Sequence, residues 1–226
     1  MVLVVGGLLV LALVFAPALW AQAVLRWYRD DRPDFPGTGG ELARHLLDEA
    51  GLGDVAVEPT ERGDHYDPEA KAVRLSAAHF DGRSLAAVVV AAHEVGHALQ
   101  DRDGYAPLAW RGRLARLAYG VEMLGSGLVY GGLALAAFAK SPAVIAAAFG
   151  VGVISRLALV TVHAVTLPVE WNASFARALP LLDGGNYVPK PDLGAARRIL
   201  RACALTYVAS SLVSLLNLWR WLRFMR

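Results

Sequence analysis

Two histidines spaced four residues apart constrain this chain more than any other feature. His93 and His97 flank Glu94 in the run HEVGH, inside an uninterrupted stretch of helix-compatible residues from 85 to 100. Ser84 stands where it can cap the start of that helix. Because a helix turns about 100° per residue, side chains four positions apart share a face and can reach one metal ion. The sequence therefore predicts a helix over residues 85–100 with a metal site on one face.

The motif also specifies a chemistry. HExxH is the zincin signature, in which two histidines bind zinc beside a glutamate. Zinc lowers the pKa of a bound water to about 7, and an adjacent glutamate can accept its proton and pass it to a leaving amine. The pattern predicts one Zn²⁺ held by His93 and His97, with Glu94 as the general base of peptide hydrolysis. The alternative is that His93 and His97 are solvated or core histidines of an amphipathic helix that binds no metal.

A zinc peptidase needs a third protein ligand and an open position for water. The metzincin continuation is absent, because Gln100 and Asp103 stand where that motif requires glycine and histidine. Glu170 is the strongest candidate, since Pro168 suits a helical start just before it. His163 lies on the same helical face but about 10 Å further along the axis, so a polar residue facing neighbouring helices is favoured over a supplementary ligand.

The composition predicts a membrane protein. The chain is 56% hydrophobic and 19% charged, and four segments can each supply the roughly 20 apolar residues that a spanning helix requires. These segments are residues 2–25, 117–139, 141–166 and 202–219. The predicted fold is a mainly α integral membrane protein with about four transmembrane helices and a small zincin-like α+β catalytic domain containing a short strand pair.

Five regions follow from this organisation. They are an N-terminal transmembrane anchor (1–28), a zincin-like catalytic region with the HExxH helix (29–116), a transmembrane hairpin (117–166), a third-ligand helix and loop (167–201) and a C-terminal transmembrane helix (202–226). Residues 21–23 resemble a signal-peptide cleavage site, but no basic residue precedes the first apolar run, so an uncleaved anchor is expected.

Charge and cysteine content bear on location and partners. The net charge of +2 gives no reason to expect a nucleic-acid partner. Most arginines flank the predicted spans on the side of the two large loops, which favours catalytic loops on the cytoplasmic side. Cys203 is the only cysteine, so an internal disulfide is excluded and a reducing compartment is compatible with the sequence.

Short strands are expected before the motif helix, at residues 55–58 and 72–76. A free strand edge beside a zinc-binding helix could hold an extended substrate by adding it to the sheet. An ordinary hairpin packed on the helix fits the sequence equally well.

The turn between these strands carries two further candidate residues. His65 and Tyr66 could donate hydrogen bonds to the oxyanion that forms when water attacks a carbonyl, or could contact substrate. Alternatively, Asp64 and Asp67 build the turn and the two rings pack over it.

Five segments together resemble the YugP group of neutral zinc metallopeptidases, which are small bacterial membrane proteins. They are residues 64–68 (DHYDP), 73–76, 91–100, 166–170 and 204–209. The resemblance implies that His93, His97 and Glu170 bind zinc, that Glu94 is the base, and that the chain resides in a bacterial cytoplasmic membrane. Asn172 departs from the family, which usually has Asp there, and so removes a negative charge from the surroundings of the metal ligands.

The expected function is a membrane-anchored, gluzincin-like endopeptidase that cuts membrane proteins or peptide chains presented near the lipid bilayer. The alternative is a zinc-dependent membrane scaffold or quality-control adaptor that binds chains without cutting them. Either function leaves room for an oligomer or a regulatory membrane partner. A zinc transporter is disfavoured, because charged residues bound the motif helix at both ends.

Overall fold

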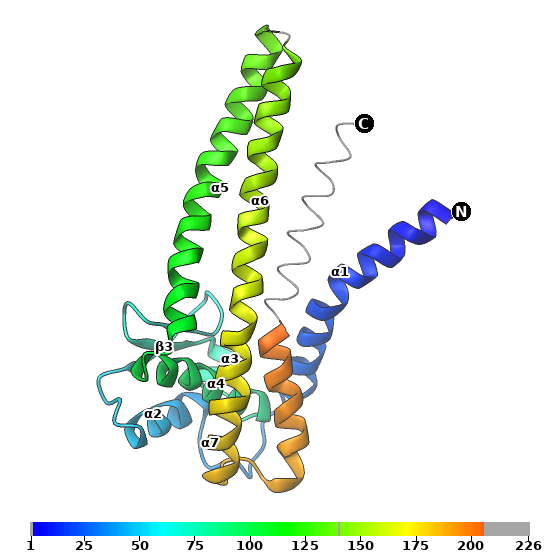
Figure 1. Ribbon diagram of the computed structural model, residues 1–226. Coiled ribbons are helices and arrows are strands. Elements are labelled where there is room, and N and C mark those ends of the chain that lie inside the picture. Colours follow the sequence, from blue (N-terminus) through cyan, green and yellow to red (C-terminus); the bar gives the residue numbers. More distant parts are fainter. Residues whose placement is uncertain (1, 140, 206–226) are drawn as a thin grey trace. The chain divides into compact units, whose positions relative to one another are not determined.

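The computed structural model describes residues 2–139 and 141–205, which fall into two compact units (Figure 1). Of the described residues, 17–108 and 167–205 make up the motif unit, which contains His93, His97 and Glu170. The hairpin unit comprises residues 2–16, 109–139 and 141–166. Three long helices, α1 (Val2–Trp27), α5 (Ala106–Ala139) and α6 (Pro142–Trp171), contribute residues to both units.

Within the hairpin unit, α5 and α6 lie against each other with small residues at the contact. A Cβ atom added to Gly125 of α5 would lie 2.0 Å from the Ser155 hydroxyl of α6. Ser155 is buried and donates a hydrogen bond to the Val151 carbonyl one turn earlier, at 2.8 Å. Glycine at position 125 therefore permits the close approach of the two helices.

The prediction of about four transmembrane helices is wrong for the described part of the chain, where no helix is both long enough and apolar enough to cross a membrane. A run of apolar residues in a sequence does not reveal what covers it in the folded protein. Part of that apolar surface faces protein: Ala21 and Val24 of α1 belong to the core of the motif unit, and Ala118 of α5 and Ala148 of α6 are also buried. Residues 206–219 of the fourth predicted span lie outside the described residues.

Helix α4 (Leu85–Arg102) is the centre of the motif unit. Every residue from Leu85 to Gln100 is buried, as expected for a helix surrounded by other elements on all sides. The Ser84 hydroxyl accepts a hydrogen bond from the Ala87 amide and so caps the helix start, as the sequence predicted.

Short elements surround α4. In chain order they are α2 (Gly39–Glu49), β1 (Ala56–Pro59), β2 (His65–Asp67), β3 (Ala72–Leu75), α3 (Ala77–Phe80), a π-helix η1 (Asn172–Ala178), α7 (Leu179–Gly184), a 3₁₀ turn η2 (Lys190–Asp192) and a helical segment over residues 193–205.

The strands form a three-stranded sheet in the order β1-β3-β2. Both predicted strands are present, but they pair in parallel, with Ala56 opposite Ala72, and do not form a hairpin. The predicted turn supplies the third strand, β2, which pairs antiparallel to β3 with Tyr66 opposite Val73. The Asp67 carboxylate accepts hydrogen bonds from the two amides that follow β2 and so builds the turn into β3.

Asp64 joins the segment before β2 to the start of α3. One carboxylate oxygen accepts hydrogen bonds from the Ser76 amide at 2.7 Å and the Ser76 hydroxyl at 3.0 Å. The other lies 2.8 Å from Nδ1 of His79. Burial acts to raise the pKa of Asp64, but the His79 and Ser76 contacts outweigh it and leave the pKa below its ordinary value of 3.8.

Replacing Asp64 by asparagine tests this junction. Asp64→Asn is expected to lower the free energy of unfolding at pH 7 by about 1–3 kcal/mol, because charge-assisted hydrogen bonds are lost. Since the folded-state pKa is lowered, the carboxylate contributes stability above the ordinary value of 3.8 and loses it as the pH falls through the folded value.

In denaturant titrations, the difference in free energy of unfolding between the wild type and Asp64→Asn should therefore shrink as the pH falls below 3.8. Asp30→Asn is the control, because the Asp30 side chain is 93% exposed. A difference that stays constant down to the acid limit would contradict this account.

Candidate metal centre

Three buried side chains converge in the motif unit. His93 and His97 come from α4, and Glu170 comes from the last turn of α6. Nε2 of His97 lies 3.2 Å from Oε2 of Glu170, and Nε2 of His93 lies 3.3 Å from the same oxygen. In the described part of the chain, these residues form the only group of three or more His, Cys, Asp or Glu side chains that could hold a metal ion.

The spacing of the three ligand atoms fits zinc. Bonds of roughly 2.1 Å at tetrahedral angles place two ligand atoms about 3.4 Å apart. The two histidine-to-glutamate distances, 3.2 and 3.3 Å, agree with that separation. Two imidazole nitrogens and one carboxylate oxygen are the donor set of many catalytic zinc sites.

Glu170 is held in its charged form. Its side chain is only 1% exposed, and burial alone would raise the pKa of this carboxyl. The electrostatic influence of His97 and the hydrogen bonds from both histidines outweigh burial, so the pKa of Glu170 lies well below its ordinary value. A buried carboxylate that stays ionised is suited to binding a cation.

Glycine in the middle of the motif permits the approach of α4 to η1. A Cβ atom on Gly96 would lie 2.7 Å from the carbonyl oxygen of Ala173, which is closer than real Cβ contacts allow. Glu170 precedes Ala173 by three residues. The missing side chain therefore brings the α4 histidines and Glu170 within reach of one ion.

Both histidine rings are contacted on the side away from Glu170. Nδ1 of His97 lies 2.9 Å from Oε1 of Gln100, and Nδ1 of His93 lies 3.1 Å from the Ser174 hydroxyl. Gln100 and Ser174 are fully buried. No sequence pattern predicts the Ser174 contact, because Ser174 is 81 residues away from His93.

Asn172 contacts Gln100, which in turn contacts the His97 ring. Its Oδ1 atom accepts hydrogen bonds from Nε2 of Gln100 at 2.9 Å and from Nε of Arg177 at 3.1 Å. The structure thus places this predicted neighbour of the metal ligands behind Gln100, in contact with Arg177. Arg177 is five residues after Asn172, a spacing that the wider turn of a π-helix brings onto one face.

The other predicted site residues have different partners. The buried Tyr66 donates a hydrogen bond from its hydroxyl to the Asp101 carboxylate at 2.7 Å, and burial together with Asp101 raises the pKa of Tyr66. Nδ1 of His65 lies 2.8 Å from the Gly63 carbonyl, in its own turn. Glu94 is buried on α4 beside His93, and the side chain of His163 lies outside the described residues.

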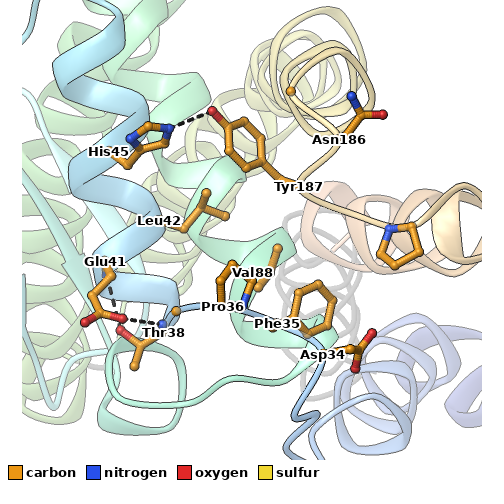
Figure 2. Close-up of a pocket in the computed structure, with 13 residues that line it drawn as sticks. Asp34, Phe35, Pro36, Thr38, Glu41, Leu42, His45, Val88, Asn186 and Tyr187 are labelled. Carbon is orange, nitrogen blue, oxygen red and sulfur yellow. Dashed lines mark hydrogen bonds between the residues drawn. The ribbon is translucent and has the colours of Figure 1, made fainter.

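A separate cavity of about 620 Å³ lies between α2, the segment before it and the loop after α7 (Figure 2). Figure 2 shows Phe35, Leu42 and Val88 among its lining side chains, and a hydrogen bond of 2.8 Å between Nε2 of His45 and the Tyr187 hydroxyl. None of its lining residues is a candidate metal ligand. Sequence reasoning did not predict this cavity, because its walls come from segments about 150 residues apart.

Comparison with known proteins agrees with this geometry. The sequence model of the family described as "Putative neutral zinc metallopeptidase" matches residues 2–226. The chain belongs to this family. One relative, "Putative membrane protease YugP" from Bacillus subtilis (strain 168), is 42% identical over 189 residues, which cover 81% of this chain and 78% of that protein. No solved structure matches.

Membership confirms the resemblance inferred from the five sequence segments. A zinc peptidase family implies zinc, and the two imidazoles and one carboxylate of the metal centre are donors that zinc accepts.

Filling the space at Gly96 tests the helix approach. Gly96→Ala is expected to separate α4 from η1 and to weaken zinc binding at least tenfold, because the added methyl group meets backbone at Ala173. Zinc affinity is measured by competition with a chromophoric chelator.

The matched control is Gly120→Ala on α5, where a Cβ atom meets nothing within 4 Å and alanine favours the helix. Wild-type zinc affinity in Gly96→Ala would show that this contact does not set the ligand geometry.

Proposed function

We propose that this protein is a zinc-dependent endopeptidase of the HExxH-plus-glutamate (gluzincin-like) type. In this proposal His93, His97 and Glu170 hold one zinc ion, and Glu94 is the general base. The observation that carries the proposal is the convergence of two Nε2 atoms on one carboxylate oxygen at 3.2 and 3.3 Å in a buried site.

A bound zinc ion would supply Lewis-acid polarisation of water and of the peptide carbonyl. Glu94 accepts a proton from the attacking water, whose oxygen forms the new bond to the carbonyl carbon. The same carboxyl group then donates that proton to the leaving amine as the C–N bond breaks, so Glu94 ends in its starting state. Its position next to His93 in the fully buried part of α4 supports this role.

An extended peptide is the substrate class that the fold favours. β2 is an edge strand of the sheet and contacts α4. An edge strand carries unpaired backbone groups that can bind an extended peptide by strand addition. His65 and Tyr66 lie on this strand, so substrate contact is the role we propose for His65, whereas the Tyr66 hydroxyl is engaged by Asp101.

We further propose that the enzyme works at a bacterial membrane on membrane-associated chains. The relative from Bacillus subtilis is called a membrane protease. Several large apolar side chains of the hairpin unit are exposed to solvent, and such surface is typical of contact with lipid or protein; they include Leu117, Met123, Leu124, Tyr130 and Ile154. Recovery of the protein in salt-washed membranes supports this location, and recovery in the supernatant contradicts it.

Glu94→Gln separates catalysis from metal binding. The variant is expected to bind zinc as the wild type does and to lose at least 10²-fold in the rate of peptide cleavage, because the amide cannot accept the proton. Cleavage is followed with an unfolded, fluorophore-labelled protein substrate, and zinc content is measured by mass spectrometry.

Glu61→Gln makes the same chemical change at an exposed loop position and serves as control. Unchanged cleavage in Glu94→Gln would exclude Glu94 as the base. Normal cellular function of a cleavage-dead Glu94→Gln protein would favour a zinc-dependent adaptor over a peptidase.

A further inference from the structure

We propose that the cavity of about 620 Å³ beside α2 is an exosite for a peptide segment that carries a large apolar side chain next to a lysine or arginine. Such a site holds part of a substrate chain away from the bond that is cut. The peptide nature of the ligand rests on the proposed function, because a peptidase acts on chains. The apolar and cationic character of the ligand follows from the cavity itself.

The cavity has the size and the lining of a ligand site. Pockets that bind small ligands have volumes of about 300–1,000 Å³ and mostly apolar walls with a few polar groups. Here the wall combines the segment before α2, α2 itself, α4 and the loop after α7, and its apolar part includes Phe35, Leu42 and Val88 (Figure 2). Phe35 and Val88 are each only 3% exposed and belong to the hydrophobic core. An apolar side chain in this space would therefore pack against groups that the core already holds in place.

The Tyr187 ring forms one wall of the cavity and is fixed from two directions. Its hydroxyl donates a hydrogen bond to Oε2 of Glu49 at 2.9 Å and lies 2.8 Å from Nε2 of His45, and both partners belong to α2. Gly185 leaves room for the ring, because a Cβ atom there would overlap the ring carbons. The backbone of Gly185 lies in the αR region, which any residue adopts, so space for the ring is what requires glycine. The loop after α7 is thus held to α2 by the tyrosine.

The charges around the cavity favour a cationic ligand. Asp34 and Glu41 line it, and none of its described lining residues is a lysine or an arginine. Asp34 shares the Arg32 guanidinium with Asp192, so two carboxylates there face one cation. Glu49 adds a further carboxylate behind the tyrosine hydroxyl. A cleft with an excess of one sign of charge attracts the opposite charge more strongly than an open surface does.

Glu41 is the carboxylate best placed to meet that cation. Its Oε2 atom accepts a hydrogen bond from the Thr38 amide at 2.7 Å, which completes the capping box at the start of α2. The side chain is exposed and, among the residues that the structure describes, forms no ion pair. A lysine or arginine of a bound peptide can therefore pair with Glu41 without displacing an internal cation.

The cavity lies on a different side of α4 from the metal centre. Val88 lines the cavity and precedes His93 by five residues. This spacing corresponds to about 7.5 Å along the helix axis and a rotation of about 140°. A peptide segment in the cavity therefore leaves the metal centre unoccupied, and its binding can be measured separately from cleavage.

Peptide binding to the full-length protein tests the proposal. The protein carries Glu94→Gln so that the probe stays intact, and the probe is the peptide fluorescein-Gly-Gly-Leu-Phe-Lys-Gly-Gly-amide, followed by fluorescence anisotropy. Saturable binding is expected. Replacing the phenylalanine of the probe by alanine should weaken binding at least tenfold, because the apolar contacts of the ring are lost. Replacing its lysine by glutamate should weaken binding at least fivefold, because a like charge then faces the carboxylates.

Two pairs of variants locate the site. Gly185→Ala should weaken binding at least fivefold, because the added methyl group displaces the Tyr187 ring, whereas Gly184→Ala, where a Cβ atom meets nothing within 4 Å, should bind as the parent protein does. Glu41→Gln should weaken binding about two- to fivefold, the usual effect of one exposed charge pair. It keeps the capping box, which glutamine also forms. Glu61→Gln, the same change at an exposed loop position, is its control.

Cross-linking shows directly where the apolar side chain of the probe lies. Benzoylphenylalanine replaces the phenylalanine of the probe, and mass spectrometry identifies the labelled residues after illumination. Labelling within residues 34–45 or 185–189 supports the proposal, also where a variant fails to fold. Labelling confined to residues 65–67 or 93–97 would place the peptide at the sheet edge or at the metal centre and would overturn the proposal.

The outcomes distinguish this inference from the proposed function. Binding that depends on the phenylalanine and the lysine of the probe and on Gly185 supports the exosite, even if the wild type cleaves no peptide. Equal binding of the parent, alanine and glutamate probes overturns it, even if the wild type is an active peptidase. Displacement of the probe by an equal concentration of phenethylamine would show that a small organic cation suffices and would overturn the assignment to a peptide.

Discussion

The close approach of α4 to the α6–η1 segment is the contact on which the metal centre depends. α4 alone provides two imidazoles, and a third ligand must come from a segment about 70 residues later in the chain. A helix pair normally keeps its axes 8–10 Å apart, at a distance set by the side chains between them. At Gly96 no side chain intervenes, and the Ala173 carbonyl occupies that space. Gly96 thus has a packing role, in addition to the roles proposed for the histidines and the glutamate of the motif.

Burial of three ionisable side chains at this contact needs compensation. Transfer of an isolated carboxylate into a protein interior is strongly unfavourable unless it is paired and hydrogen-bonded. Glu170 meets this requirement through both histidines, and each histidine has a buried partner on its other nitrogen. The site is therefore organised by the protein itself, and a cation added at its centre would join groups that already face one another. Preorganisation of this kind lowers the reorganisation needed for binding.

Local features were predictable from the sequence, and long-range pairings were not. The helix over residues 85–100, its Ser84 cap and two of the strands follow from periodicity and capping chemistry, which act within a few residues. Glu170 could be nominated because the chemistry requires a third ligand. The parallel pairing of β1 with β3, the third strand and the Ser174 contact depend on packing between distant segments. Apolar runs in a sequence do not distinguish the interior of a membrane from a protein core.

X-ray absorption spectroscopy at the zinc edge identifies the ligands of the bound metal independently of activity. We expect a single zinc environment in the wild type, with two imidazole ligands and carboxylate or water oxygen in the remaining positions. Glu170→Gln should change the oxygen shell and leave the two imidazole ligands unchanged. A wild-type spectrum with fewer than two imidazoles, or with a sulfur ligand from Cys203, would exclude zinc coordination by His93, His97 and Glu170.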